Sequence, residues 1–315
     1  MSAAEARTAV IALGGNALSP PGERATIADQ FRHTRKSLEP IVDLALQGWN
    51  LCIVHGNGPQ VGDELTRNEL ARGEVEPLPL GVLVASTAGW IGYMIQQSLE
   101  NALQRAGSTR EVVTLITQVQ VRPDDPAMAD PTKLIGHDLT EGRARSLELK
   151  GHAVKEVDGA YRRIVGSPAP WMVHELGVIK FLVDRGTIVI ACGGGGVPVF
   201  RDEELGLEGV DAVVDKDLAA AVIARDLGAD LFMILTNVDA VYADWGTDQQ
   251  RALTELTVEE AERLDAAGAL GEGSMAPKVR GAVDYVRHTS GRAIIAELAQ
   301  GRDAVRGTAG TTILP

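Results

Sequence analysis

The residues best suited to chemistry lie between Thr187 and Leu218. The run from Thr187 to Cys192 consists of small and β-branched residues, and this pattern predicts a strand buried on both faces. Four glycines, Gly193, Gly194, Gly195 and Gly196, follow it. Glycine lets the backbone approach a ligand closely and turn its N–H groups toward it. On their own, these glycines are equally consistent with a plain loop.

Lys216 stands between Asp215 and Asp217, in the first turn of a predicted helix that stops at Gly228. A cation at a helix N-terminus opposes the helix dipole, at a cost of about 0.3–1 kcal/mol. A bound anion would reverse that sign, because helix N-termini attract anions. The glycine loop and Lys216 together therefore favour a phosphate site over a solvated lysine.

Lysine is scarce in this chain, which has seven lysines and 23 arginines. Three of them, Lys133, Lys216 and Lys278, stand in turns flanked by Gly or Pro or at helix starts. Lysine is a compact, mobile point charge that suits a phosphoryl group in transit. Lys133 lies between Pro131 and Gly136, where a moving flap could carry it over a site, although a surface turn is the simpler alternative.

Several predicted strands end in loops rich in Gly and Asn. In an open α/β sheet, ligands bind beyond the carboxyl ends of the strands. Together with Lys216 and Lys278, these loops predict an anion cradle for at least two phosphate-bearing groups. The loop residues are Gly14, Gly15, Asn16, Gly56, Asn57, Gly58, Gly193 to Gly196, Thr236 and Asn237.

Phosphoryl transfer fits these residue types, because its transition state needs charge neutralisation and in-line positioning more than a nucleophile. Two lysines from different helices can follow the phosphoryl group from donor to acceptor. Asp217 can hold those lysines in place and keep them charged. Removing one such clamp typically costs about 10²–10³ in rate.

The predicted elements that position these loops alternate between strand and helix, which indicates a mostly parallel sheet with helices on both faces. A segment over residues 122–170 is rich in Pro, Asp and Gly, and we interpret it as an inserted flap with short strands at 152–157 and 161–165. Strands are predicted at 8–13, 51–54, 111–120, 187–192, 230–236, 292–296 and 311–314. Helices are predicted at 26–47, 83–105, 172–185, 216–227, 257–267 and from about 278.

Composition and charge exclude several classes of protein. The 315 residues suffice for one large α/β domain or two lobes. The net charge of −13 disfavours nucleic acid and anionic membranes as partners. We expect a cytoplasmic protein, because no signal peptide or membrane span is evident. Cys52 and Cys192 fall in predicted buried strands and are interpreted as reduced core thiols.

Other familiar motifs are missing or incomplete. The chain has no G-x-x-x-x-G-K-[ST] sequence of a P-loop enzyme and no G-x-S-x-G nucleophile elbow. Gly56, Gly58 and Gly62 only loosely resemble a dinucleotide fingerprint, since Pro59 interrupts the turn, and a Rossmann dehydrogenase is disfavoured. The six histidines are scattered, so no protein-held metal site is expected.

The motifs taken together closely resemble the carbamate kinases, of the amino acid kinase superfamily. The resemblance covers nearly the whole chain, in order. It rests on ALGGNAL (12–18), HGNGPQVG (55–62), TQVQV (117–121), PTKLIG (131–136), YRRIVGSPAP (161–170), ACGGGGVPV (191–199), VDKDLAA (214–220) and GSMAPKV (273–279).

The resemblance implies a three-layer α/β/α sandwich with a protruding flap, in a homodimer. It implies reversible phosphoryl transfer between ATP, carried with Mg²⁺, and carbamate, often run in the ATP-forming direction. Residues 1–205 would form the acceptor lobe, with the flap inserted at about 122–170, and residues 206–315 the nucleotide lobe.

Site roles follow from the same resemblance. Lys216 and Lys278 would bridge the transferred phosphoryl group, with Asp217 orienting them, and Lys133 would reach the carbamoyl phosphate side from the flap. The acceptor would lie against Gly14, Gly15, Asn16, Gly56, Asn57, Gly58, Gly193, Gly194, Gly195 and Gly196. The nucleotide would be bordered by Lys216, Thr236, Asn237, Val238, Tyr242, Met275 and Lys278.

Two segments differ from the family pattern, residues 137–139 in the flap and residues 87–90 near the acceptor. Two alternatives therefore stay open. One is a related kinase for another carboxylate or a phosphonate, which acceptor selectivity would reveal. The other is a nucleotide sensor without turnover, which the three lysines argue against.

Overall fold

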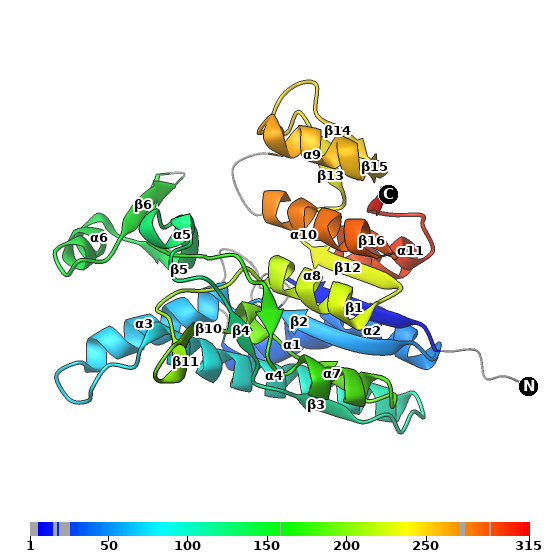
Figure 1. Cartoon of the computed structure of the whole chain (residues 1–315), viewed down its shortest axis with the longest axis horizontal. Coiled ribbons are helices and arrows are strands. Elements are labelled where there is room, and N and C mark those ends of the chain that lie inside the picture. Colours follow the sequence, from blue (N-terminus) through cyan, green and yellow to red (C-terminus); the bar gives the residue numbers. More distant parts are fainter. Residues whose placement is uncertain (1–5, 15–17, 19–25, 158, 271–274, 290) are drawn as a thin grey trace, which may run out of the picture.

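A mainly parallel sheet of eight strands forms the centre of the molecule (Figure 1). The computed structural model describes residues 6–14, 18, 26–157, 159–270, 275–289 and 291–315. Neighbouring strands are parallel throughout, except for the antiparallel pair β16–β17. The order is β15 (Glu255–Thr257), β17 (Thr311–Leu314), β16 (Arg292–Glu297), β12 (Leu231–Thr236), β1 (Thr8–Leu13), β2 (Asn50–His55), β9 (Ile188–Ile190) and β3 (Val112–Thr114).

Helices cover both faces of this sheet, which confirms the predicted three-layer sandwich. Alternate residues of β1 enter different cores: Val10 and Ala12 pack on one side, and Ile11 and Leu13 on the other. This alternation follows from the period of two along a strand. One face packs on α7 (Leu176–Val183), α8 (Lys216–Leu227), α9 (Val258–Ala266) and α10 (Met275–His288). The other packs on α1 (Ile27–Ser37), α2 (Glu39–Leu46), α4 (Leu80–Arg105) and α11 (Gly301–Val305).

The long strand predicted at 111–120 is wrong. It divides into β3, in the central sheet, and β4 (Gln118–Gln120), in a second sheet with β8 (Met172–Val173), β10 (Val197–Asp202) and β11 (Gly206–Gly209). The chain turns at Thr117, whose hydroxyl accepts a hydrogen bond from Cys192 N at 2.8 Å and whose carbonyl accepts one from Val197 N at 2.8 Å. These bonds carry the chain from one sheet to the other. A further pair joins β13 (Val241–Ala243) and β14 (Arg251–Leu253).

Two helix predictions also need correction. The single helix expected at 26–47 is two helices, α1 and α2, that meet at Leu38. Pro40 lies in the first turn of α2, where its missing N–H does no harm but prevents α1 from continuing. The helix expected at 172–185 begins only at Leu176, because Met172 and Val173 pair with β4. The helices expected at 83–105 and 257–267 are confirmed as α4 and α9, and α9 has its capping box at Thr257.

The predicted flap is a subdomain that stands out from the body beside α3 (Gly58–Ala71), as Figure 1 shows. Its antiparallel sheet has the order β5 (Lys133–Leu139), β7 (Ala160–Val165), β6 (Val154–Val157), which confirms the two short strands expected there. The flap also contains α5 (Pro126–Ala129) and α6 (Glu141–Glu148), which the sequence did not predict. Lys133 begins a strand rather than lying in a turn.

Two further expectations concern the whole chain. Cys52 and Cys192 are both free and buried. Within the described residues, the helices are too short or too polar to cross a membrane.

Candidate functional site

A cavity of about 460 Å³ opens at the carboxyl ends of β1, β2 and β12, under the flap. This is the edge at which ligands bind in open α/β sheets. It brings together eleven predicted residues from seven separate stretches of the chain. They are Gly14, Gly56, Asn57, Gly58, Lys133, Gly194, Lys216, Asp217, Thr236, Asn237 and Lys278.

Asp217 lies between two lysines in this cavity. Its Oδ1 pairs with Lys216 Nζ, and its Oδ2 lies 3.3 Å from Lys278 Nζ. The side chains of Lys216, Lys278 and Asp217 are only 11%, 6% and 3% exposed, so the solvated lysine considered from the sequence is not what the fold produces. Two ammonium groups share one carboxylate, and this leaves a net positive charge at a buried helix start.

The pKa of Lys216 is shifted by its burial and by the charged side chains beside it. Burial lowers its pKa, and the neighbouring Asp217 carboxylate opposes that effect, while Lys278 adds to it. A phosphate oxygen in the cavity would act like a further carboxylate, because an opposite charge nearby favours the charged form of an ammonium group. A bound anion would therefore stabilise the charged form of Lys216.

Asp215 is a site residue for which the sequence predicted no role. Its Oδ1 accepts a hydrogen bond from Asp217 N at 2.8 Å and caps α8, while its Oδ2 pairs with Lys133 Nζ of the flap. Burial raises the pKa of Asp215, but the charges of Lys133 and Lys216 outweigh burial and hold the pKa well below its usual range. Aspartate before an apolar helix is a recognisable capping signal. Its partner 82 residues away is not visible from sequence.

The glycine loop makes a left-handed turn after β9. Gly194, Gly195 and Gly196 have φ of +68°, +91° and +87°, and Cys192 has φ of +46°. A Cβ on Gly194 would lie 2.2 Å from Asn57 Nδ2, and one on Gly195 would lie 2.1 Å from Val214 O. Only Gly194 reaches the cavity wall, whereas Gly193, Gly195 and Gly196 are buried behind it. The loop is thus built by close packing as much as by ligand access.

Asn57 is oriented by Thr87, which belongs to one of the two segments that depart from the family pattern. Asn57 Nδ2 donates a hydrogen bond to Thr87 Oγ1 at 2.9 Å, and this hydroxyl lies 2.9 Å from both Leu83 O and Val84 O. Thr87 is fully buried. The α4 helix therefore fixes the amide that lines the cavity.

Arg162 of the flap also lines the cavity, and its guanidinium donates a hydrogen bond to Gly136 O. The sequence analysis gave it no role. A signal was present, because consecutive residues of a strand point to opposite faces. Arg162 and Arg163 are adjacent in one strand, so their side chains point to opposite faces of the flap sheet. Two separate roles for these arginines could therefore have been predicted.

The remaining predicted residues lie away from the cavity wall or cannot be placed. Gly15 and Asn16 fall outside the described residues. Among the described ones, Val238 and Tyr242 follow β12, and the Tyr242 hydroxyl donates to Asp239 Oδ1 at 2.7 Å. Met275 begins α10, three residues before Lys278. None of these three lines the described cavity.

Known proteins are similar to this chain over nearly its whole length. The model of the amino acid kinase family matches residues 7–297. The carbamate kinase of Pyrococcus furiosus is 43% identical over 310 residues, covering 97% of this chain and 98% of that protein. The carbamate kinase of Halobacterium salinarum is 46% identical over 308 residues, with 97% and 98% covered.

Solved structures show the same relationship. A carbamate kinase from Giardia lamblia bound to AMP-PNP has a TM-score of 0.90 and 36% identity, with 98% of both chains covered. A second structure of that enzyme, bound to citric acid, has a TM-score of 0.92. The chain therefore belongs to the amino acid kinase family and, within it, to the carbamate kinases.

Proposed function

We propose that this protein is a carbamate kinase that transfers a phosphoryl group reversibly between ATP and carbamate. The observation that carries the proposal is the buried arrangement of Lys216, Asp217 and Lys278 at the start of α8. A metaphosphate-like transition state requires stabilisation of its oxygens by positive charge and little covalent chemistry. Two largely buried ammonium groups held by one carboxylate would provide that charge.

We infer that the lysines act at different points of the transfer. Lys216 and Lys278 lie together at the helix termini and would follow the phosphoryl group between donor and acceptor. Lys133 approaches from the flap and would neutralise charge on the acceptor side. Asn57 and Gly194, which share the cavity wall, would hold the acceptor in line for attack.

We further propose a division of the chain by substrate. Residues 1–205, with the flap at about 122–170, would bind carbamate or carbamoyl phosphate, and residues 206–315 would bind the nucleotide. Support comes from the cavity wall, where Asn57 and Gly194 come from the first part and Thr236 and Asn237 from the second. Val238, Tyr242 and Met275 are in the second part and would border the adenosine.

We propose that Mg²⁺ enters on the phosphates of the nucleotide. Two carboxylates of the cavity wall are engaged by ammonium groups, Asp215 with Lys133 and Asp217 with Lys216 and Lys278, and Glu297 is a third carboxylate in that wall. In the described ranges no group of three or more His, Cys, Asp or Glu side chains could hold a metal ion. The phosphate oxygens of the nucleotide would supply ligands for the metal, a mode that Mg²⁺ commonly uses.

The proposed assembly is a homodimer. Ile116 and Tyr93 are 47% and 55% exposed. Ile116 lies against α4, since its Cδ1 is 3.7 Å from the position of a Cβ on Gly89. Exposed apolar side chains near one another are typical of association sites. Sedimentation equilibrium at micromolar concentration, with Tyr93→Glu for comparison, would establish the state, and a monomeric wild type would contradict the proposal.

The activity is tested by measuring ATP formation from MgADP and carbamoyl phosphate, with Lys216→Ala as the control. We expect turnover that falls by about 10²–10³ in the variant, the loss typical of one electrostatic clamp. Acceptor selectivity is tested in both directions: acetyl phosphate replaces carbamoyl phosphate as the phosphoryl donor to ADP, and a phosphonate replaces carbamate as the phosphoryl acceptor from ATP. Tight ADP binding without turnover would instead favour a nucleotide sensor.

A further inference from the structure

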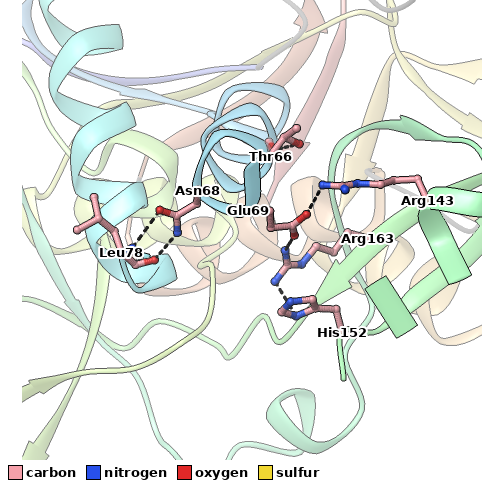
Figure 2. Close-up of polar contacts among 8 residues, drawn as sticks. Thr66, Asn68, Glu69, Leu78, Arg143, His152 and Arg163 are labelled. Carbon is pink, nitrogen blue, oxygen red and sulfur yellow. Dashed lines mark hydrogen bonds and ion pairs between the residues drawn. The ribbon is translucent and has the colours of Figure 1, made fainter. Parts of the chain in front are cut away.

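A buried charge cluster joins the flap to α3, outside the cavity (Figure 2). Glu69 of α3 directs its carboxylate toward two flap arginines. Its Oε1 accepts a hydrogen bond from Arg163 Nη1 at 3.0 Å, and its Oε2 pairs with Arg143 Nη2. Arg163 Nη2 lies 3.0 Å from His152 Nδ1. The Glu69 side chain is only 10% exposed, so water screens these pairs poorly.

Glu69 is needed to compensate the arginines. The side chain of Arg163 is 15% exposed and that of Arg143 is 32% exposed. Burial lowers the pKa of Arg163, and the carboxylates of Glu69 and Asp211 oppose that effect. Removing one partner of a buried pair is costly because it leaves an uncompensated charge. Loss of the Glu69 charge would therefore favour movement of the flap arginines toward water.

Backbone packing also holds the flap against α3. A Cβ on Gly62 of α3 would lie 1.9 Å from Gly136 Cα of β5, so the two backbones are in direct contact. Ile135, next to Gly136, is 2% exposed and packs in an apolar cluster with Val61 and Leu65 of α3. Charge pairing, glycine contact and apolar packing thus hold β5 on α3 together.

The strand β5 links this contact between the flap and α3 to the cavity. Arg163 lies opposite Ile135 in the β5–β7 register, and Val165 lies opposite Lys133. With a rise of about 3.3 Å per residue, Lys133 is only about 7 Å along the strand from the clamped position. A paired strand moves as a unit, so a shift of the flap at Glu69 would displace Lys133 from Asp215.

We propose that Glu69 is a positioning residue that sets the place of Lys133 in the cavity by holding the flap arginines Arg143 and Arg163. The proposal rests on the proposed function, because Lys133 is there assigned to the acceptor side. It predicts an effect confined to the acceptor. A displacement of about 1 Å can cost about 10²-fold in rate.

The test compares Glu69→Gln with Glu64→Gln. Glu64 lies on the same helix, and its carboxylate pairs with Arg67 of α3 at 2.6 Å. We expect Glu69→Gln to lower kcat/KM for carbamoyl phosphate by about tenfold or more, with KM for ADP unchanged. Glu64→Gln should keep the wild-type values. A KM for ADP raised as much as the KM for carbamoyl phosphate, or an unchanged kcat/KM for carbamoyl phosphate, would overturn the proposal.

A double variant separates positioning from a general structural loss. If Glu69 acts through Lys133, Glu69→Gln should have no further effect on turnover once Lys133 is alanine. An additive loss in Lys133→Ala/Glu69→Gln would overturn the proposal. If Glu69→Gln does not fold, Arg143→Gln removes one arm of the cluster and leaves Arg163 compensated, with the same acceptor-specific loss expected.

Amide hydrogen exchange tests, independently of turnover, whether Glu69 holds the flap against α3. Exchange over residues 133–139 and 160–165 should become at least about tenfold faster in Glu69→Gln than in Glu64→Gln. Unchanged protection would overturn the proposal whatever the activity. A wild type that does not turn over carbamoyl phosphate, with exchange faster in Glu69→Gln, would instead count against the proposed function alone.

Discussion

Lys278 Nζ lies 3.3 Å from Oδ2 of Asp217, whose Oδ1 pairs with Lys216. The two lysines belong to different helices, α10 and α8. These helices approach closely at Gly281, where a Cβ would lie 2.9 Å from Asp217 O. Helix packing and the carboxylate thus set the separation of the two ammonium groups together.

Asp217→Asn should affect both stability and catalysis. The amide keeps the shape of the side chain but removes the carboxylate charge that Lys216 and Lys278 share. We expect the free energy of unfolding to fall by about 3 kcal/mol, as for a broken buried pair, and kcat to fall by about 10²–10³. Urea unfolding and ATP-forming turnover measure the two effects.

The matched control for this change is Asp226→Asn. Asp226 pairs with Arg225 on the same helix at 2.8 Å, and its side chain is 26% exposed. Pairs of this kind contribute at most about 1 kcal/mol. A loss of stability as large as that of Asp217→Asn would contradict the importance that we assign to burial of the lysine pair.

Thr87→Val should weaken acceptor binding. Valine matches threonine in shape but cannot accept the hydrogen bond from Asn57 Nδ2. Freed from Thr87, the amide no longer has one fixed orientation, and we expect kcat/KM for carbamoyl phosphate to fall by about tenfold, since a hydrogen bond is worth about 1 kcal/mol or somewhat more. Steady-state kinetics with carbamoyl phosphate and with ADP should show the loss for the first substrate only.

Thr114→Val is the same substitution at a site without this function. Within the part of the chain that the structure describes, Thr114 Oγ1 is buried and has no hydrogen-bond partner. Its replacement should leave both KM values unchanged. If Thr114→Val reduced acceptor turnover as much as Thr87→Val, the hydrogen bond to Asn57 would not be the cause.

Gly62→Ala should loosen the flap. Alanine inside a helix is normally more favourable than glycine by about 1 kcal/mol. Here the added methyl would lie 1.9 Å from Gly136 Cα and would push β5 away from α3. We expect faster amide exchange in residues 133–139 and at least about tenfold lower turnover. Gly73→Ala, where nothing lies within 4 Å of the new methyl, should change neither.

The sequence predicts the sheet of this fold well, because its periodicity is local. Five apolar residues follow Thr8 in β1, and α9 begins at a capping box that four residues define. The failures occur where a distant contact decides the outcome. Thr117 divides one apparent strand between two sheets because its hydroxyl and carbonyl bind residues more than 70 positions away.

The site residues also fall into two groups, those that local sequence signals predict and those that only distant contacts reveal. The residue types and the loop positions indicate Lys216, Asp217 and Lys278, because helix starts and glycine loops are local signals. The partners that hold them are not local. Asp215 meets Lys133 only after the flap folds back, and Glu69 meets Arg143 and Arg163 across 74 and 94 residues. Such pairs become visible only in the structure.

The last prediction concerns His55, which is fully buried at the end of β2. Burial lowers its pKa to about 4, because the imidazolium would lose its hydration, and hydrogen bonding to Gly56 O only partly opposes this. The unfolded chain takes up a proton near pH 6.5, whereas the folded protein does so only near 4. Stability that is fully present above pH 6.5 is therefore lost as the pH falls toward 4, by about 3 kcal/mol.

His55→Gln should remove this contribution, so its destabilisation relative to wild type, measured by urea unfolding, should shrink between pH 7.5 and 4. Val54→Ala, equally buried in the same strand but not titratable, should show a constant difference. A His55→Gln difference that is also constant with pH would contradict the prediction.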